Sequence, residues 1–180
     1  MSEVADAEGG SGGDVPLTYE QATAALTGPG GFFELATEDV LGEQMQVFAN
    51  RPRSLRDLLM GAAQKGDEEY AVFDDAGERR VLTFGGLQQQ VASVAAALVD
   101  RGIGHGDRVA ILAANCPEYI VTFWACASMG AVAVCFNGWW TRSEIEYGLE
   151  ATRPALLVAD RRRLARLEGA DTGVPTIVVE

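Results

Sequence analysis

The stretch RVAILAANCPEYIVTFWACASMGAVAVCF, residues 108–136, contains two apolar runs that flank an apolar helical segment. The runs at 108–113 and 131–136 are apolar apart from Arg108, as expected for strands of a parallel sheet that is covered on both faces. Pro117 suits the first position of a helix, and residues 117–129 are apolar on nearly every side. We therefore predict a strand, a helix that is the most buried one of the chain, and a second parallel strand.

The same alternation continues toward the C-terminus. A capping box of Thr141 and Glu144 predicts a helix at 141–150, and a strand at 155–159, a helix at 161–167 and a strand at 175–179 follow. Strands that alternate with helices connect by right-handed crossovers into a parallel sheet with helices on both faces. The predicted fold class is therefore α/β, with a mostly parallel sheet.

Upstream of the sheet the sequence predicts three parts. Residues 1–16 are rich in Gly, Ser, Asp and Glu, which is typical of a disordered acidic tail. Residues 17–69 are expected to form a helical covering segment, with helix starts at Thr18 and Ser54 and no clear period at 32–50. Residues 70–180 are the α/β subdomain, which opens with a β-hairpin at 70–84 before a helix capped by Thr83.

The negative charge of the chain is concentrated at one end. The 180 residues carry a formal net charge of −12, and nine acidic residues fall within 1–50, where Lys and Arg are absent. Residues 51–180 are nearly balanced, so no nucleic-acid surface is indicated. No apolar stretch reaches the roughly 18 residues of a membrane span. Cys116, Cys126 and Cys135 lack metal-site spacing, and we expect reduced thiols in a cytoplasmic protein.

Motifs that carry chemistry are absent or stand in the wrong order. The glycine-rich stretch 102–107 follows a predicted helix and precedes a strand, the reverse of a dinucleotide-binding turn. It is interpreted as a tight turn, with His105, the only histidine, as a solvated residue. Neither a G-x-S-x-G elbow nor a Walker-type phosphate loop occurs. Asp160 before three arginines at 161–163 favours a helix cap with a solvated basic face over an anion site.

One segment carries a candidate site. Asn137, Gly138, Trp139 and Trp140 follow a buried parallel strand, at the edge where α/β sheets bind their ligands. Tryptophans in such a loop equally serve to cover the sheet end or a neighbouring domain. Asn137, Trp139 and Trp140 are therefore predicted to form the wall of a pocket or of an interface, and both alternatives stay open.

With these elements placed, residues 82–160 resemble the AMP-binding, adenylate-forming superfamily. The resemblance rests on an ordered set of stretches: LTFGGL at 82–87, AALVDRGIGHGDRVAIL at 96–112, NCPEY at 115–119, GAVAV at 130–134 and EIEYGL at 144–149. The last stretch and the loop at 137–141 look most like bacterial fatty-acid or aryl-acid CoA ligases. The chain departs from the family pattern at Gly86, where an acidic residue is usual, and at Cys135, where proline is common.

The resemblance implies the N-terminal part of an acyl-CoA synthetase. Such an enzyme uses ATP, Mg²⁺ and CoA to convert a fatty or aromatic carboxylate into acyl-CoA, AMP and pyrophosphate. In typical members the phosphate loop begins shortly after the strand that corresponds here to 176–179, and this chain stops at Glu180. We therefore assign no catalytic, cofactor-binding or metal-ligating residue and expect the 180 residues alone to be inactive.

Partners follow from the same resemblance. We expect the remainder of the synthetase to pack on this segment, and a homodimer to form through surface left exposed without it. The alternative is a self-contained α/β binding or interaction module without catalysis. An independent Rossmann domain is disfavoured, because residues 113–117 (AANCP) lack the glycines that a dinucleotide-binding turn requires.

Overall fold

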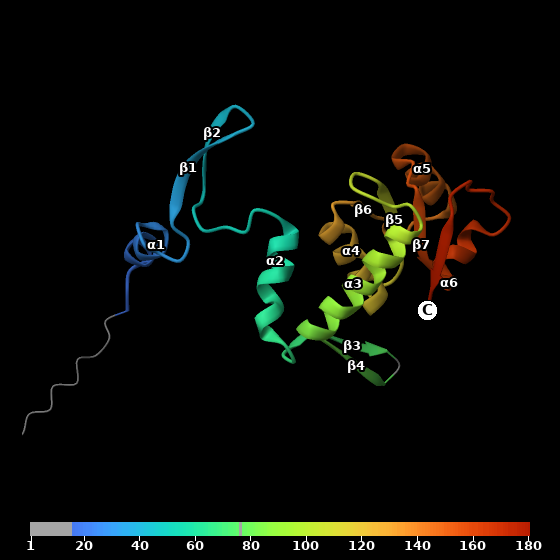
Figure 1. Cartoon of the computed structure of the whole chain (residues 1–180), viewed down its shortest axis with the longest axis horizontal. Coiled ribbons are helices and arrows are strands. Elements are labelled where there is room, and N and C mark those ends of the chain that lie inside the picture. The colour runs from blue at the N-terminus through green and yellow to red at the C-terminus, as the bar shows by residue number, and fades with distance from the viewer. Residues whose placement is uncertain (1–15, 76) are drawn as a thin grey trace, which may run out of the picture. The chain divides into compact units, whose positions relative to one another are not determined.

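The computed structural model describes residues 16–75 and 77–180. The predicted tail, 1–16, lies outside the described residues except for Pro16. The chain divides into two compact units, Met1–Arg51 and Pro52–Glu180, and Figure 1 traces the order of their elements.

The described residues of the first unit, 16–51, form one helix and one hairpin. Helix α1 (Tyr19–Thr27) begins with the predicted capping box: Gln21 donates its N–H to the Thr18 hydroxyl, and the Gln21 side chain accepts the N–H of Thr18. Strands β1 (Leu35–Val40) and β2 (Glu43–Phe48) pair antiparallel. This hairpin differs from the helical covering segment expected for 17–69.

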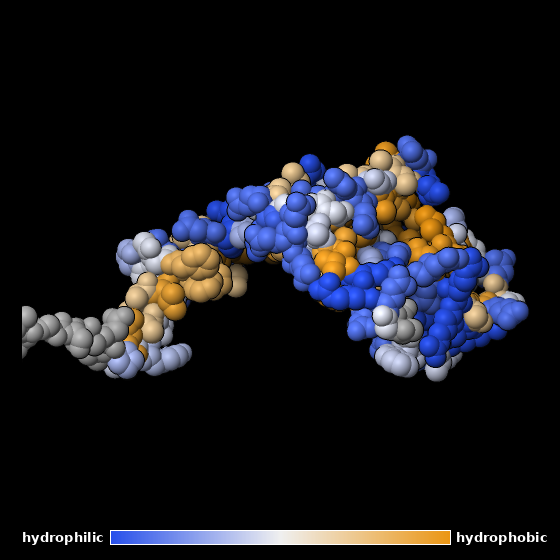
Figure 2. Space-filling view, turned by 90° about the horizontal axis from the view of Figure 1, so that it is seen from below, coloured by the Kyte–Doolittle hydropathy of each residue, from blue (hydrophilic) through white to orange (hydrophobic). Residues whose placement is uncertain are grey.

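Large apolar side chains lie on the surface of this unit. Within residues 16–51 no side chain is buried, and Figure 2 shows apolar groups exposed on the unit. Phe32 is 81% exposed, and its ring packs edge-on against Phe33, which in turn contacts Phe48. Leu35 lies opposite Phe48 in the hairpin. Residues 16–51 therefore form an apolar cluster but bury no side chain completely.

The second unit opens as the sequence predicts. Helix α2 (Leu55–Gly61) is capped by Ser54 and runs into the 3₁₀ helix η1 (Ala62–Lys65). Strands β3 (Glu69–Asp75) and β4 (Glu78–Thr83) form the expected hairpin. Helix α3 (Phe84–Asp100) follows, with the Thr83 hydroxyl accepting the N–H of Gly86. The Trp124 indole donates to the Tyr70 hydroxyl, which ties the hairpin to the helix of the predicted strand-helix-strand segment.

Four parallel strands form the sheet of this unit. They are β5 (Arg108–Leu112), β6 (Val132–Cys135), β7 (Leu156–Asp160) and β8 (Thr176–Val179), in the order β6-β5-β7-β8. The connecting helices are α4 (Pro117–Met129), α5 (Arg142–Thr152) and α6 (Arg161–Leu164), which continues as the 3₁₀ helix η2 (Ala165–Leu167). This arrangement confirms the predicted α/β class.

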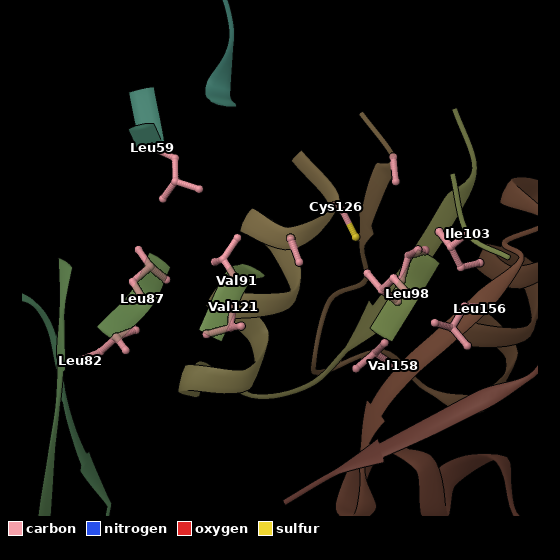
Figure 3. Close-up of a cluster of buried hydrophobic side chains, with 13 residues drawn as sticks. Leu59, Leu82, Leu87, Val91, Leu98, Ile103, Val121, Cys126, Leu156 and Val158 are labelled. Atoms are coloured by element: carbon pink, nitrogen blue, oxygen red, sulfur yellow. The ribbon is translucent and has the colours of Figure 1, made fainter. Parts of the chain in front are cut away.

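Residues of β5 and β7 divide the core between the two faces of the sheet. Val109 and Val158 belong to a cluster with α3 and α4, whose members from Leu59 to Val158 are drawn in Figure 3. Ala110, Leu112 and Leu157 belong to a second cluster with α5. Helix α4 has no exposed residue and four buried ones, more than any other described helix, which confirms the prediction that the helix at 117–129 is the most buried.

Truncation of Leu157 tests how much the sheet depends on this packing. Its side chain is fully buried, so Leu157→Ala is expected to lower the free energy of unfolding by about 2–5 kcal/mol through lost burial and a residual cavity. Val132→Ala is the matched control on edge strand β6, where the side chain is 47% exposed, and its loss is expected to stay below about 1 kcal/mol. Urea denaturation followed by circular dichroism measures both. Equal losses for the two variants would contradict the burial argument.

Candidate functional site

The carboxyl ends of β5, β6 and β7 meet at one edge of the sheet, beside a pocket of about 370 Å³. Strand order reverses between β5 and β7, and open α/β sheets bind ligands at such a point. The walls come from the loop after β5, from α4, from the loop after β6 and from α6; they include Asn115, Tyr119, Asn137, Gly138, Trp139 and Arg163.

The structure separates the three residues predicted as a pocket or interface wall. Asn137 and Trp139 line the pocket, and the Trp139 side chain is 82% exposed. Trp140 instead turns into the core, where its ring lies 5.0 Å from that of Phe136. The role of Asn137 and Trp139 as a binding wall stays a prediction, whereas the contacts of Trp140 are those of an anchor for the loop.

The anchor depends on a glycine in the neighbouring helix. A Cβ on Gly148 of α5 would lie 2.9 Å from Cζ3 of Trp140 and 3.0 Å from Cζ of Phe136. Such distances are shorter than ordinary van der Waals contact, so only glycine leaves room for both rings. Within the loop, the Asn137 side chain accepts the N–H of Trp139, and the Asn137 carbonyl accepts the N–H of Trp140. These bonds set the loop as a turn with the Trp139 indole outward.

Asp160 at the end of β7 is the predicted helix cap. Its Oδ1 accepts the N–H of Arg163 at 2.8 Å, which confirms the cap. Its Oδ2 accepts two further donors, the N–H of Ala114 at 2.8 Å and Nη1 of Arg163 at 2.7 Å. The carboxylate therefore joins the loop after β5 to the start of α6.

Two arginines hold the loop after β6. Nε of Arg163 donates to the carbonyl of Gly138 at 3.1 Å, and Nη1 of Arg166 donates to the same carbonyl at 2.9 Å. Nη1 of Arg166 also donates to the Trp140 carbonyl at 2.8 Å. Two loop carbonyls that lie away from regular secondary structure are satisfied in this way.

The solvated basic face predicted for 161–163 is wrong at one of its three positions. Arg161 and Arg162 are exposed, and Arg161 pairs with Glu180 at the surface. Arg163 points the other way, with its side chain only 13% exposed, because the Gly138 carbonyl and Asp160 offer it acceptors. The spacing of Asp160, Arg163 and Arg166 at i, i+3 and i+6 is the sequence signal for one shared helix face.

Electrostatics at this edge favour a charged Asp160. Burial alone would raise the pKa of Asp160, but the N–H groups of Arg163 and Ala114 and the Arg163 guanidinium together lower it below the usual range. Burial, with a smaller contribution from Cys135, raises the pKa of Tyr119 to about 12. Burial likewise raises the pKa of the Cys126 thiol to about 11. These two groups are therefore protonated at neutral pH and are poor nucleophiles.

The glycine-rich stretch at 102–107 forms the turn that the sequence predicts. It follows α3 and precedes β5, with Gly102 and Gly106 at positive φ and the N–H of Gly104 bonded to Asp107. His105 lies exposed at the C-terminus of α4, where its ring packs over Gly130. A Cβ on Gly130 would lie 2.5 Å from Cδ2 of His105. The stretch therefore links α3 to β5 and holds no phosphate cradle.

Across residues 16–75 and 77–180, no three His, Cys, Asp or Glu side chains lie together in a way that could hold a metal ion. None of the helices described is both long and apolar enough to cross a membrane.

Comparison with known proteins gives consistent matches. The sequence profile described as AMP-binding enzyme matches residues 59–180. The acyl-CoA ligase sidI of Beauveria bassiana is 37% identical over 130 residues, which cover 68% of this chain and 22% of that ligase.

Two solved structures share the fold. The anthranilate CoA ligase AuaEII, in complex with anthranoyl-AMP, superposes with a TM-score of 0.65 at 23% identity, over 73% of this chain and 26% of that one. A fatty acyl-adenylate ligase from L. pneumophila superposes with a TM-score of 0.63 at 20% identity, over 71% of this chain and 23% of that one. The chain spans less than a quarter of the length of the sidI ligase.

Substitution of Gly148 tests whether the packing of the Trp140 ring requires a glycine at this position. Gly148→Ala is expected to lower the free energy of unfolding by about 1–3 kcal/mol, because the new methyl group overlaps the Trp140 and Phe136 rings. Gly61→Ala is the matched control: it is a helical glycine with open space around it, and a gain of up to about 1 kcal/mol is expected. Both are measured by urea denaturation. A Gly148→Ala variant that is more stable than the wild type would show that the Trp140 and Phe136 rings can shift without loss of stability.

The lowered pKa of Asp160 predicts a pH dependence of stability. A carboxyl group whose pKa is lowered on folding contributes stability above its unfolded pKa of about 3.9, and this contribution is lost as the pH falls through the folded value. Asp160→Asn is therefore expected to be less stable than the wild type at pH 6–7, with the difference closing below about pH 4. Urea denaturation across that range measures the difference. A gap that stays constant down to pH 3 would exclude the ionised carboxylate as its cause.

Proposed function

The chain belongs to the family of AMP-binding enzymes, and on that premise we propose that it is the first part of an ATP-dependent acyl-CoA ligase. The proposed reaction of the whole enzyme joins a carboxylate to CoA, with ATP cleaved to AMP and pyrophosphate. The observation that carries the proposal is the family match over 59–180, which spans α3 and the complete parallel sheet.

The part that this chain plays is structural. ATP and Mg²⁺ would supply the activated phosphate and neutralise its charge in the whole enzyme, but the described residues present no set of metal ligands. They supply a four-stranded sheet and hold the loops at its carboxyl edge through Asp160, Arg163 and Arg166. The isolated chain is therefore proposed to be inactive.

The substrate, the assembly and the compartment are further parts of the proposal. A fatty or aromatic carboxylate is supported by the names of the two structural neighbours, one an anthranilate CoA ligase and one a fatty acyl-adenylate ligase. A homodimer is supported by exposed apolar side chains, among them Phe32 and Leu41. A cytoplasmic location is supported by three free cysteines, Cys116, Cys126 and Cys135.

Calorimetric titration of the 180-residue chain with ATP and Mg²⁺, then with a non-hydrolysable acyl-adenylate mimic, tests the assigned role. We expect no binding of either ligand, together with a cooperative thermal transition that shows a folded protein. Micromolar binding of ATP would mean that these residues form a nucleotide site and that the structural role is wrong.

The self-contained α/β module is the competing hypothesis. If the gene encodes further residues after Glu180, the longer product is expected to form acyl-CoA from a carboxylate, ATP and CoA, with release of pyrophosphate. Release of pyrophosphate that depends on the added carboxylate measures this activity. A stop codon directly after Glu180, with no companion subunit that restores activity, would favour the module.

A further inference from the structure

The two loops that face the pocket are bonded to one short segment. The loop at 113–116 follows β5, and the loop at 137–140 follows β6. The first loop donates the Ala114 N–H to Asp160 at the end of β7. The second loop accepts hydrogen bonds from Arg163 in α6 and Arg166 in η2. The red end of the chain in Figure 1 contains this segment.

Asp160 and Arg163 connect the first loop to the second. The Oδ2 atom of Asp160 is shared between the Ala114 N–H and Nη1 of Arg163, so the carboxylate cannot turn without affecting both. The same guanidinium uses Nε for the Gly138 carbonyl. A continuous path of three hydrogen bonds therefore runs from Ala114 through Asp160 and Arg163 to Gly138.

Arg166 closes the path on the second loop. Its Nη1 shares the Gly138 carbonyl with Arg163 and also reaches the carbonyl of Trp140. The side chains of Arg163 and Asp160 are only 13% and 14% exposed, so their bonds are less screened by water than a surface ion pair. The fit is close, since a Cβ on Gly138 would lie 2.7 Å from Nε of Arg163.

We propose that Asp160, Arg163 and Arg166 act as one clasp that couples the loop at 113–116 to the loop at 137–140, so that both walls of the pocket order and loosen together. The three are positioning residues, because they act on the pocket through the loops. Trp139 is thereby held at the rim although its side chain is 82% exposed. A ligand or protein segment that contacts either loop meets a surface already ordered, which lowers the entropic cost of binding.

Amide hydrogen exchange of the 180-residue chain, read residue by residue by NMR, tests the coupling in both directions. Asp160→Asn is expected to speed exchange at Trp139 and Trp140 by about tenfold or more, although Asp160 bonds to neither amide. Arg166→Gln is expected to speed exchange at Ala114, whose N–H is bonded to Asp160 and not to Arg166, by about threefold or more.

Two controls separate the clasp from general destabilisation. Arg162→Gln changes an exposed arginine in the same helix turn and should leave Ala114, Trp139 and Trp140 unchanged. The amides of β5 at 109–112 report global unfolding, so in each variant they should speed up only by the factor that its loss of free energy of unfolding accounts for, and by less than the loop amides. If each variant speeds only the loop that it touches, the bonds are independent and the clasp is refuted. If β5 amides exchange faster to the same extent as the loops, the effect is global and coupling between the loops is likewise refuted.

Discussion

The second unit depends on the complete burial of β5. This strand has a parallel neighbour on either side and helices over both faces, and its residues from Val109 to Leu112 have no exposed area. Such a strand can be built only from apolar side chains, since a polar group there would lose water without gaining a partner. The same burial determines where the helices α3, α4 and α5 lie. Each of them packs its apolar side chains against β5 and the neighbouring strands.

Because the strands are buried, polar side chains and backbone groups without a partner in the sheet lie at the ends of the strands. Backbone groups that leave the ladder at the carboxyl edge still need partners, and they lie where water reaches them only in part. Asp160 and the two arginines meet that need from one short segment, 160–166, with Asp160 as acceptor and Arg163 and Arg166 as donors. The same edge is where proteins of this architecture bind ligands, so the groups that complete the fold also shape the pocket.

The parts of this fold that could be predicted from the sequence are those specified by neighbouring residues. Continuous apolar runs indicated the four strands, and Thr18, Ser54, Thr83 and Asp160 marked helix starts. The hairpin at 35–48 was missed because its strands alternate only weakly between apolar and polar residues. Its turn also places Leu41, rather than a usual turn residue such as Asn or Asp, at positive φ before Gly42. The bonds of Arg163 and Arg166 join residues 25 to 28 positions apart, which no local pattern encodes.

Because residues 16–51 have no fully buried side chain, they contribute little to the signal of a denaturation experiment on this protein. Cooperative unfolding and its heat capacity arise from apolar surface that becomes hydrated, and residues 16–51 bury less of this surface than the sheet and its helices do. Melting curves and denaturant slopes are therefore expected to report mainly on Pro52–Glu180. Amide hydrogens of the hairpin and α1 are therefore expected to exchange faster than those of the sheet, because few buried apolar contacts hold these elements closed.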